Sequence, residues 1–306
     1  MSTSRDGREP LGRVLTAMIT PFTAEGEVDH ERAWELARHL TEHGSEGLVV
    51  TGTTGESPTL SPDEKVALYR TVVDAVQHRD TIVVAGTGTY DTAESVHLSK
   101  RAAEAGAGAI MAVTPYYSKP GQEGLARHFE SVADATDLPV LVYNIPGRTG
   151  RLIEVPTLER LAHHPNIVAT KDAVMNVDFT SHTVSRVPDL AVYSGQDSYT
   201  LPMMAVGAVG VVSVISHLAG DVVAEMVHAA AQGDLPAATR LHHRLLPLCE
   251  ACFLESNPAP VKAAMATLWG PVGEPRLPLT PASQETVRAV EKAAGMLHPA
   301  SSAPPG

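Results

Sequence analysis

A lysine at the end of an apolar run is the residue best placed to do chemistry in this sequence. The chain has six lysines: Lys65, Lys100, Lys119, Lys171, Lys262 and Lys292. Five of them lie in polar, helical or loop-like contexts, whereas Lys171 follows Ile167-Val-Ala-Thr170. In a buried strand, desolvation disfavours the ammonium form and supplies a neutral amine that can attack a ketone and form a Schiff base. Two other interpretations stay open: the amine reaches the rim of the fold, or it pairs with Asp172.

Hydroxyl groups follow other apolar runs and could serve such a lysine. A Schiff base forms through a carbinolamine that must gain and lose protons, and Tyr143, Thr53 and Tyr117 could relay them to water. The turn at Thr53 and Thr54 is flanked by glycines, so its successive backbone N–H groups could bind a small carboxylate. Each residue alone also has an ordinary structural interpretation, as a packed aromatic or a turn former.

The elements that must position these residues are short apolar runs that alternate with longer segments of helical periodicity. The eight runs are residues 14–20, 47–51, 81–85, 109–113, 139–144, 167–171, 190–194 and 209–214. Such alternation is typical of repeated βα units with strands buried on both faces. Eight units fit a (β/α)8 TIM barrel better than an open doubly wound sheet, because Gly86-Thr-Gly-Thr89 is only a fragment of a dinucleotide-binding motif. In a barrel, the residues that close the strands converge at one mouth.

Helix-start signals support this order. Ser61-Pro-Asp-Glu64 predicts a capping box at the start of a helix, and Asp91 with Glu94 predicts a similar start. Asp29 is placed to begin a further helix and Gly44 to end it. The predicted divisions are a disordered tail (1–10), the barrel (11–216), a C-terminal helical extension (217–297) and a second disordered tail (298–306).

Composition limits the partners. The 306-residue chain has a formal net charge of -12, which argues against nucleic acid or an anionic membrane as partner and favours small metabolites. No run approaches the roughly 20 apolar residues of a membrane span and no apolar signal segment opens the chain, so we expect a cytoplasmic protein.

Two cysteines raise a separate question. Cys249 and Cys252, with His242 and His243 upstream, have spacings that can close around zinc. Their setting in a leucine-rich helix and the absence of a second ligand pair favour small buried residues, so we expect no metal.

The motifs together resemble the dihydrodipicolinate synthase / N-acetylneuraminate lyase family from Val14 to about Leu297. Four segments carry the resemblance: Gly52-Thr-Thr-Gly-Glu-Ser57, Thr114-Pro-Tyr-Tyr117, Tyr143-Asn-Ile-Pro-Gly-Arg-Thr149 and Thr170-Lys-Asp-Ala173. The resemblance implies a Schiff-base lyase without metal or organic cofactor, which binds pyruvate and works as a tight homodimer, usually paired into a tetramer. It also implies roles for eight residues. Lys171 is the nucleophile, Tyr143 the acid and base, and Thr53 and a neighbouring subunit's Tyr117 complete the relay. The Thr54 N–H holds the pyruvate carboxylate, Arg148 binds the second substrate, and Gly195 and Val212 line the pocket.

Arg148 bears on the second substrate. A guanidinium there could grip the carboxylate of L-aspartate 4-semialdehyde, whereas family members acting on polyhydroxylated aldehydes carry other residues after this motif. A keto-deoxy-sugar acid aldolase or N-acetylneuraminate lyase stays open as an alternative, and so does a non-catalytic keto-acid-binding barrel.

The resemblance also implies an effector site. Lysine-inhibited relatives bind lysine at the dimer interface through a histidine and an asparagine where this chain has Lys65 and Tyr90. Ser57, Glu94 and Tyr116 are kept. We expect weak sensitivity or none, because a cation at Lys65 should repel the effector's ammonium and Tyr90 is bulky.

Overall fold

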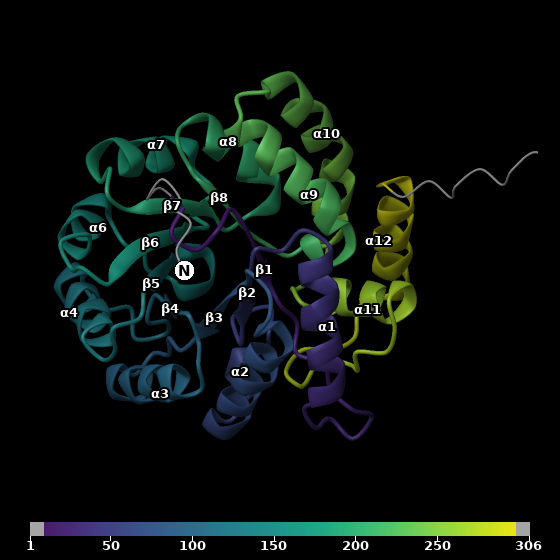
Figure 1. Ribbon diagram of the computed structural model, residues 1–306, viewed down its shortest axis with the longest axis horizontal. Helices are drawn as coiled ribbons and strands as arrows, with labels where there is room; N and C mark the ends of the chain where they lie inside the picture. Colours follow the sequence, from purple (N-terminus) through teal and green to yellow (C-terminus); the bar gives the residue numbers. More distant parts are fainter. Residues whose placement is uncertain (1–8, 298–306) are drawn as a thin grey trace, which may run out of the picture.

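The computed structural model describes residues 9–297 and has the architecture of a closed parallel barrel. Eight strands pair in sequence order, with β1 closing onto β8, and helices surround them (Figure 1). The strands are β1 Val14–Ala17, β2 Gly47–Val50, β3 Ile82–Gly86, β4 Ala109–Val113, β5 Val140–Asn144, β6 Ile167–Asp172, β7 Ala191–Ser194 and β8 Gly210–Ser213. The predicted fold class is therefore confirmed.

Helices follow the strands. They are α1 His30–Glu42, α2 Pro62–Val76, α3 Thr92–Glu104, α4 Gln122–Ala133, α5 Pro146–Thr149, α6 Val155–Leu161, α7 Val177–Arg186, α8 Thr200–Ala205, α9 Ser216–Ala231, α10 Leu235–Ala251, α11 Ala259–Leu268 and α12 Gln284–Leu297, with 3-10 turns η1 Ser57–Thr59 and η2 Asp197–Tyr199. Helices α9 to α12 gather beside α1 on one side of the barrel (Figure 1). The predicted tails lie outside the described residues, apart from Glu9 and Pro10. None of the helices within residues 9–297 combines the length and apolar character that a membrane span needs.

The predicted helix signals are present. Ser61 and Glu64 form a reciprocal capping box at α2, and the Asp29 side chain accepts from a backbone N–H of α1. Gly44 has a φ of +86°, and a Cβ there would approach Ala224 Cβ to 2.8 Å, so only glycine fits this turn. The first strand is shorter than predicted because Ile19 leaves the ladder and donates its N–H to the buried ring of His217 at 3.1 Å.

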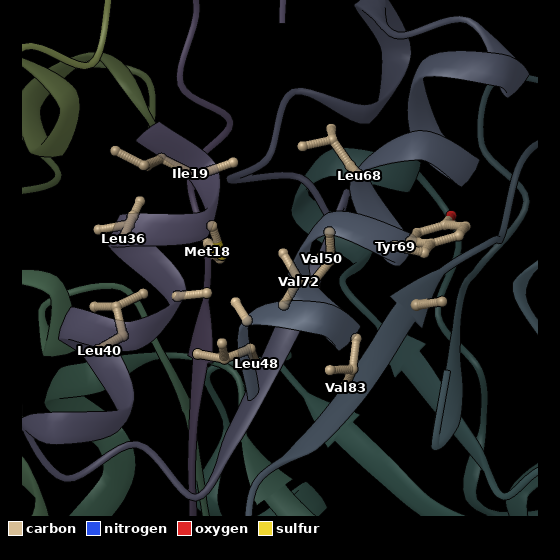
Figure 2. Close-up of a cluster of buried hydrophobic side chains, with 14 of the residues drawn as sticks. Met18, Ile19, Leu36, Leu40, Leu48, Val50, Leu68, Tyr69, Val72 and Val83 are labelled. Carbon is tan, nitrogen blue, oxygen red and sulfur yellow. The ribbon is translucent and has the colours of Figure 1, made fainter. Parts of the chain in front are cut away.

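Two apolar layers hold the barrel. Inside it, alternate residues of the strands pack together, and the Tyr193 hydroxyl closes the amino-terminal end by donating to Gly12 O at 2.7 Å. Outside it, side chains of β2 and β3 pack against α1 and α2, as Figure 2 shows around Leu48, Leu36 and Tyr69. Burial of this kind contributes about 25 cal/mol per Å² and fixes the strand ends that carry the polar residues.

Candidate active site

Strand periodicity places Lys171 inside the barrel. Lys171 pairs in register with Tyr143 of β5 and Tyr193 of β7, whose side chains belong to the interior cluster. Its side chain is buried, with 5% of the residue exposed. Successive strand residues point to opposite faces, so Asp172 faces the helices and accepts from Thr180 Oγ1 at 2.7 Å. Both alternative interpretations of Lys171, at the rim or paired with Asp172, are therefore wrong.

The barrel interior prepares this amine for attack on a carbonyl. Burial lowers the pKa of Lys171 to about 7, with the nearby carboxylate of Asp197 acting against this shift and the guanidinium of Arg148 adding to it. No ion pair within 4.0 Å holds Lys171 among residues 9–297. Near pH 7 the Lys171 amine is therefore neutral in a large fraction of the molecules, as nucleophilic attack requires.

Asp197 is a buried carboxylate to which the sequence analysis gave no role. It accepts from Ser213 Oγ at 2.5 Å, from Val214 N at 2.9 Å and from Ile215 N at 3.3 Å. These bonds tie the loop after β7 to the end of β8. Burial raises the pKa of Asp197, while these hydrogen bonds and the charge of Lys171 act to lower it and favour its ionised form.

Tyr143 lies beside the amine. The Lys171 Nζ is 4.2 Å from the centroid of the Tyr143 ring, and only 4% of Tyr143 is exposed. Burial raises the pKa of Tyr143 to about 12, while the charge of Arg148 and the contact with the Thr53 hydroxyl act to lower it. The phenol therefore stays protonated at neutral pH and can donate a proton to a developing oxyanion or hydroxyl leaving group.

The loop after β2 forms a cradle of backbone donors. Thr51 and Glu56 lie at its two ends in the left-handed region, with φ of 54° and 57°. Within residues 9–297, the N–H groups of Thr53 and Thr54 have no hydrogen-bond acceptor. Consecutive unpaired N–H groups in such a turn suit a small carboxylate.

Arg148 lines a cavity of about 210 Å³ at the mouth of the barrel. Thr53, Tyr143 and Tyr116 line the same cavity. The Arg148 side chain is exposed in α5, and the described part of the chain offers it no ion-pair partner within 4.0 Å. Because no ion pair holds it among the described residues, this cation is available to an anionic ligand.

Gly195 lies close to Lys171. Val212 belongs to the interior cluster. A Cβ at Gly195 would meet Ala173 Cβ at 2.8 Å and Lys171 Cγ at 3.1 Å. Val212 is 1% exposed and packs in the interior cluster with Tyr143. A side chain at Gly195 would thus displace the proposed nucleophile.

Tyr117 is the one predicted relay residue that its own barrel does not bring to the mouth. It is 92% exposed and has a φ of 69°, a backbone conformation that a bulky residue rarely adopts. The ring therefore projects away from the chain that carries it.

The expected effector residues gather beside the same mouth. Tyr116 and Ser57 line the cavity, and Tyr90 meets Tyr116 edge-to-face with ring centroids 5.4 Å apart. Lys65 is 5% exposed, and burial lowers its pKa while Glu94 opposes that shift. Lys65 is thus a buried amine with the carboxylate of Glu94 in its surroundings, and burial acts against the fixed cation that the sequence predicted there.

Lys262 corrects the view that Lys171 alone lies in apolar surroundings. Its Nζ forms an ion pair with Glu56 Oε1 at 2.8 Å, and the two side chains are 1% and 0% exposed. A lysine within the apolar segment Ala259-Pro-Val-Lys-Ala-Ala-Met265 was a signal for a buried pair. Asn257, just before this segment, was also missed, and it contacts Thr54.

The cysteines lie away from solvent. Cys249 and Cys252 are both unoxidised and buried in the cluster formed by α9 to α12. Burial raises the pKa of both thiols, which disfavours the thiolate that a metal needs. In the described ranges, no three His, Cys, Asp or Glu side chains are grouped as metal ligands.

The closed barrel with a buried amine at its mouth is the arrangement of a lysine-dependent, aldolase-type lyase. A model of the Dihydrodipicolinate synthetase family matches residues 10–296. The 4-hydroxy-tetrahydrodipicolinate synthase of Moorella thermoacetica is 50% identical over 290 residues, which cover 94% of this chain and 99% of that protein. The chain belongs to the dihydrodipicolinate synthetase family, as its motifs predicted.

Solved structures give the same result. A dihydrodipicolinate synthase from Bacillus anthracis has a TM-score of 0.90 and 44% identity, covering 93% of this chain and 97% of that one. The enzyme from Cyanidioschyzon merolae, solved with lysine bound, has a TM-score of 0.91 and 43% identity, covering 94% and 99%.

Proposed function

We propose that the protein condenses pyruvate with L-aspartate 4-semialdehyde, the reaction of the 4-hydroxy-tetrahydrodipicolinate synthases it resembles. The observation that carries the proposal is the buried amine of Lys171, with a pKa lowered to about 7, beside Tyr143, which lines the same cavity as Arg148. The amine supplies the nucleophile, the phenol the proton donor and the guanidinium a site for a second carboxylate.

The reaction begins with attack of the neutral Lys171 amine on the pyruvate carbonyl. Tyr143 protonates the carbinolamine oxygen, which leaves as water, and Thr53 passes protons between Tyr143 and the next hydroxyl of the relay. The Tyr143 phenolate left by this step takes a proton from the pyruvate methyl carbon, and the imine becomes an enamine. Meanwhile the N–H groups of Thr53 and Thr54 hold the pyruvate carboxylate, and Gly195 and Val212 bound the space around the methyl carbon.

The enamine carbon then attacks the aldehyde carbon of the semialdehyde, whose carboxylate binds Arg148. A new carbon–carbon bond forms and the aldehyde oxygen takes a proton. The amino group of the condensed product attacks the imine carbon and displaces the Lys171 amine. The ring closes and the enzyme returns to its starting state.

A neighbouring copy of the chain completes the relay. Tyr117 is exposed and held in a rare backbone conformation, so it can serve only another subunit's site. We infer a tight homodimer that pairs into a tetramer.

The residues at the expected effector site also bear on inhibition by lysine. The Cyanidioschyzon merolae relative was solved with lysine bound. In this chain Lys65 is buried, the charge of Glu94 acts against the lowering of its pKa, and the Tyr90 ring packs on Tyr116. We infer that lysine binds poorly there.

A coupled assay that compares aldehydes tests the function. Pyruvate is supplied with L-aspartate 4-semialdehyde, glyceraldehyde or N-acetylmannosamine, and product formation is followed for each. We expect efficient turnover only when the aldehyde supplied with pyruvate is L-aspartate 4-semialdehyde. Preference for a sugar-derived aldehyde would establish the alternative of a sugar-acid aldolase, and imine formation without turnover of any aldehyde would leave a keto-acid-binding barrel.

A further inference from the structure

A side chain from the C-terminal helical region contacts the proposed carboxylate cradle. Asn257, which precedes α11, donates from Nδ2 to Thr54 Oγ1 at 2.9 Å, across 203 positions of sequence. Asn257 is 5% exposed and Thr54 is 3% exposed, so water does not compete for this bond. The bond joins a residue without a catalytic assignment to the turn that carries the unpaired N–H groups of Thr53 and Thr54.

The direction of this hydrogen bond determines what the Thr54 hydroxyl can do. A hydroxyl has one proton to donate, and here its oxygen already accepts from Asn257. No acceptor for the Thr54 hydroxyl proton is found within residues 9–297. The proton is therefore available to a ligand, beside the unpaired N–H groups of Thr53 and Thr54.

Asn257 has an unmet hydrogen-bonding requirement of its own. Its Oδ1 is buried and has no partner among the described residues. Burying an unpaired amide oxygen costs stability, so an asparagine is an expensive choice for mere packing at this position. The contact with Thr54 gives a reason for an amide there.

A second contact from the same region holds the other end of the turn. The buried Lys262 Nζ bonds Glu56 Oε1 at 2.8 Å and Thr20 O at 3.0 Å, and Arg276 N donates to Glu56 Oε2 at 2.8 Å. Glu56 has the left-handed backbone noted above, which costs free energy unless surrounding contacts hold it. Residues outside the cavity lining thus hold the turn at both ends, and Asn257 is the one that contacts the Thr54 hydroxyl.

We propose that Asn257 is a positioning residue for keto-acid recognition: by donating to Thr54 Oγ1, it keeps the Thr54 hydroxyl directed as a donor to the pyruvate carboxylate. The inference rests on the proposed function and adds a residue to it. A hydrogen bond from a hydroxyl to a carboxylate is stronger than one between neutral groups, so its loss should weaken pyruvate binding more than it slows chemistry.

The first experiment measures pyruvate kinetics at saturating semialdehyde. In Asn257→Ala we expect the KM for pyruvate to rise about tenfold, the scale of one hydrogen bond to a charged group, with kcat changed little. The yield of borohydride-trapped adduct at sub-saturating pyruvate should fall in the same proportion. An unchanged pyruvate KM, or a fall in kcat alone, would overturn the inference.

A double-mutant cycle shows whether Asn257 acts through Thr54. Thr54→Val removes the hydroxyl, so adding Asn257→Ala to it should raise the pyruvate KM little further. Fully additive effects would mean that the two residues act independently. Asn257→Asp keeps the shape but only accepts, so it should take the hydroxyl proton and raise the pyruvate KM at least as much as alanine does.

A matched control separates positioning from stability. Asn166 is a half-buried asparagine before β6 whose Nδ2 donates to Ala133 O at 3.1 Å and Thr136 O at 3.0 Å. Asn166→Ala should lower the melting temperature and leave the pyruvate KM unchanged. Should Asn257→Ala fail to fold, Asn257→Asp and the comparison of Thr54→Ser with Thr54→Val carry the test: equal pyruvate KM in all three would refute the inference.

The trapping measurement also distinguishes two kinds of failure. If the unmodified protein forms no adduct with pyruvate and borohydride, the proposed function fails. If it forms the adduct and Asn257→Ala forms as much at every pyruvate concentration, only the role of Asn257 fails.

Discussion

The amine of Lys171 lies over the face of the Tyr143 ring, with Nζ 4.2 Å from the ring centroid. The two residues are register partners on β6 and β5. The ring face attracts a cation and would favour the ammonium form. Nevertheless the pKa of Lys171 is lowered to about 7, because burial is the larger effect. The Tyr143 ring thus shields the Lys171 amine from water. It also places the Tyr143 hydroxyl near the atoms that react at this amine.

Borohydride should trap pyruvate on Lys171. Reduction converts the reversible imine into a stable secondary amine, and peptide mapping identifies the modified lysine. Lys171→Arg should abolish the adduct because a guanidinium stays protonated. The buried Lys65 and Lys262 are internal controls, since burial lowers the pKa of both amines while a carboxylate, Glu94 or Glu56, acts against the shift. An adduct on either of them in the active protein would assign the nucleophile elsewhere.

Imine formation should depend on pH through the same group. The attacking form is the neutral amine, and a pKa of about 7 means that protonation removes it as the pH falls below that value. We expect kcat/KM for pyruvate to fall about tenfold per unit below pH 6 and to level off above pH 8. Stopped-flow or trapping rates across this range measure the profile.

A substitution at Arg148 tests whether Lys171 is the group that this pH profile reports. Its charge lowers the pKa of Lys171, so Arg148→Met should move the rising limb to higher pH. A limb that stays in place, or moves to lower pH, would mean that another group titrates.

The second carboxylate should depend on Arg148. Arg148→Ala should reduce kcat/KM for the semialdehyde by about 30-fold, or roughly 2 kcal/mol, because one partner of a charge pair is lost. The lower end of the usual range applies because the side chain is exposed before substrate binds. Pyruvate trapping should persist in this variant. Unchanged semialdehyde kinetics would reopen the sugar-acid aldolase alternative.

Local patterns in the sequence predicted the barrel and singled out Lys171, but left open whether its amine lies inside the barrel, at the rim or against Asp172. Apolar runs predicted the strands, and the alternation of side chains along β6 determines that Lys171 points inward while Asp172 points out. Contacts that close over long stretches of chain could not be predicted in this way. Lys262 meets Glu56 across 206 positions and Asn257 meets Thr54 across 203, and no local periodicity relates such partners.

Mixing two inactive variants tests the role of Tyr117. In the proposed dimer, a subunit with Tyr117→Phe keeps its own Lys171, and a Lys171→Arg partner offers it an intact Tyr117. One site of each hybrid is then complete, so refolding the two variants together should restore activity that neither has alone. Sedimentation should show the same oligomer for both variants and the mixture. No recovery despite hybrid formation would place Tyr117 outside the relay.

Lysine should inhibit this protein weakly or not at all. The carboxylate of Glu94 already interacts electrostatically with the buried amine of Lys65, which leaves it less available to an ammonium group of the effector. The Tyr90 ring, edge-on to Tyr116, fills space that a smaller residue would leave open. Regulation commonly rests on a coupling of about 1 to 3 kcal/mol, or about 5- to 150-fold, so the loss of one favourable contact can erase it.

A titration of initial rate with L-lysine at sub-saturating pyruvate measures this sensitivity. We expect little change for the unmodified protein, and increased inhibition in the double variant Lys65→His, Tyr90→Asn, because it removes the competing amine and the bulky ring together. Lys100→His, on the exposed face of α3, is the control for adding a histidine elsewhere. Strong inhibition of the unmodified protein by sub-millimolar lysine would show that Lys65 and Tyr90 do not obstruct the site.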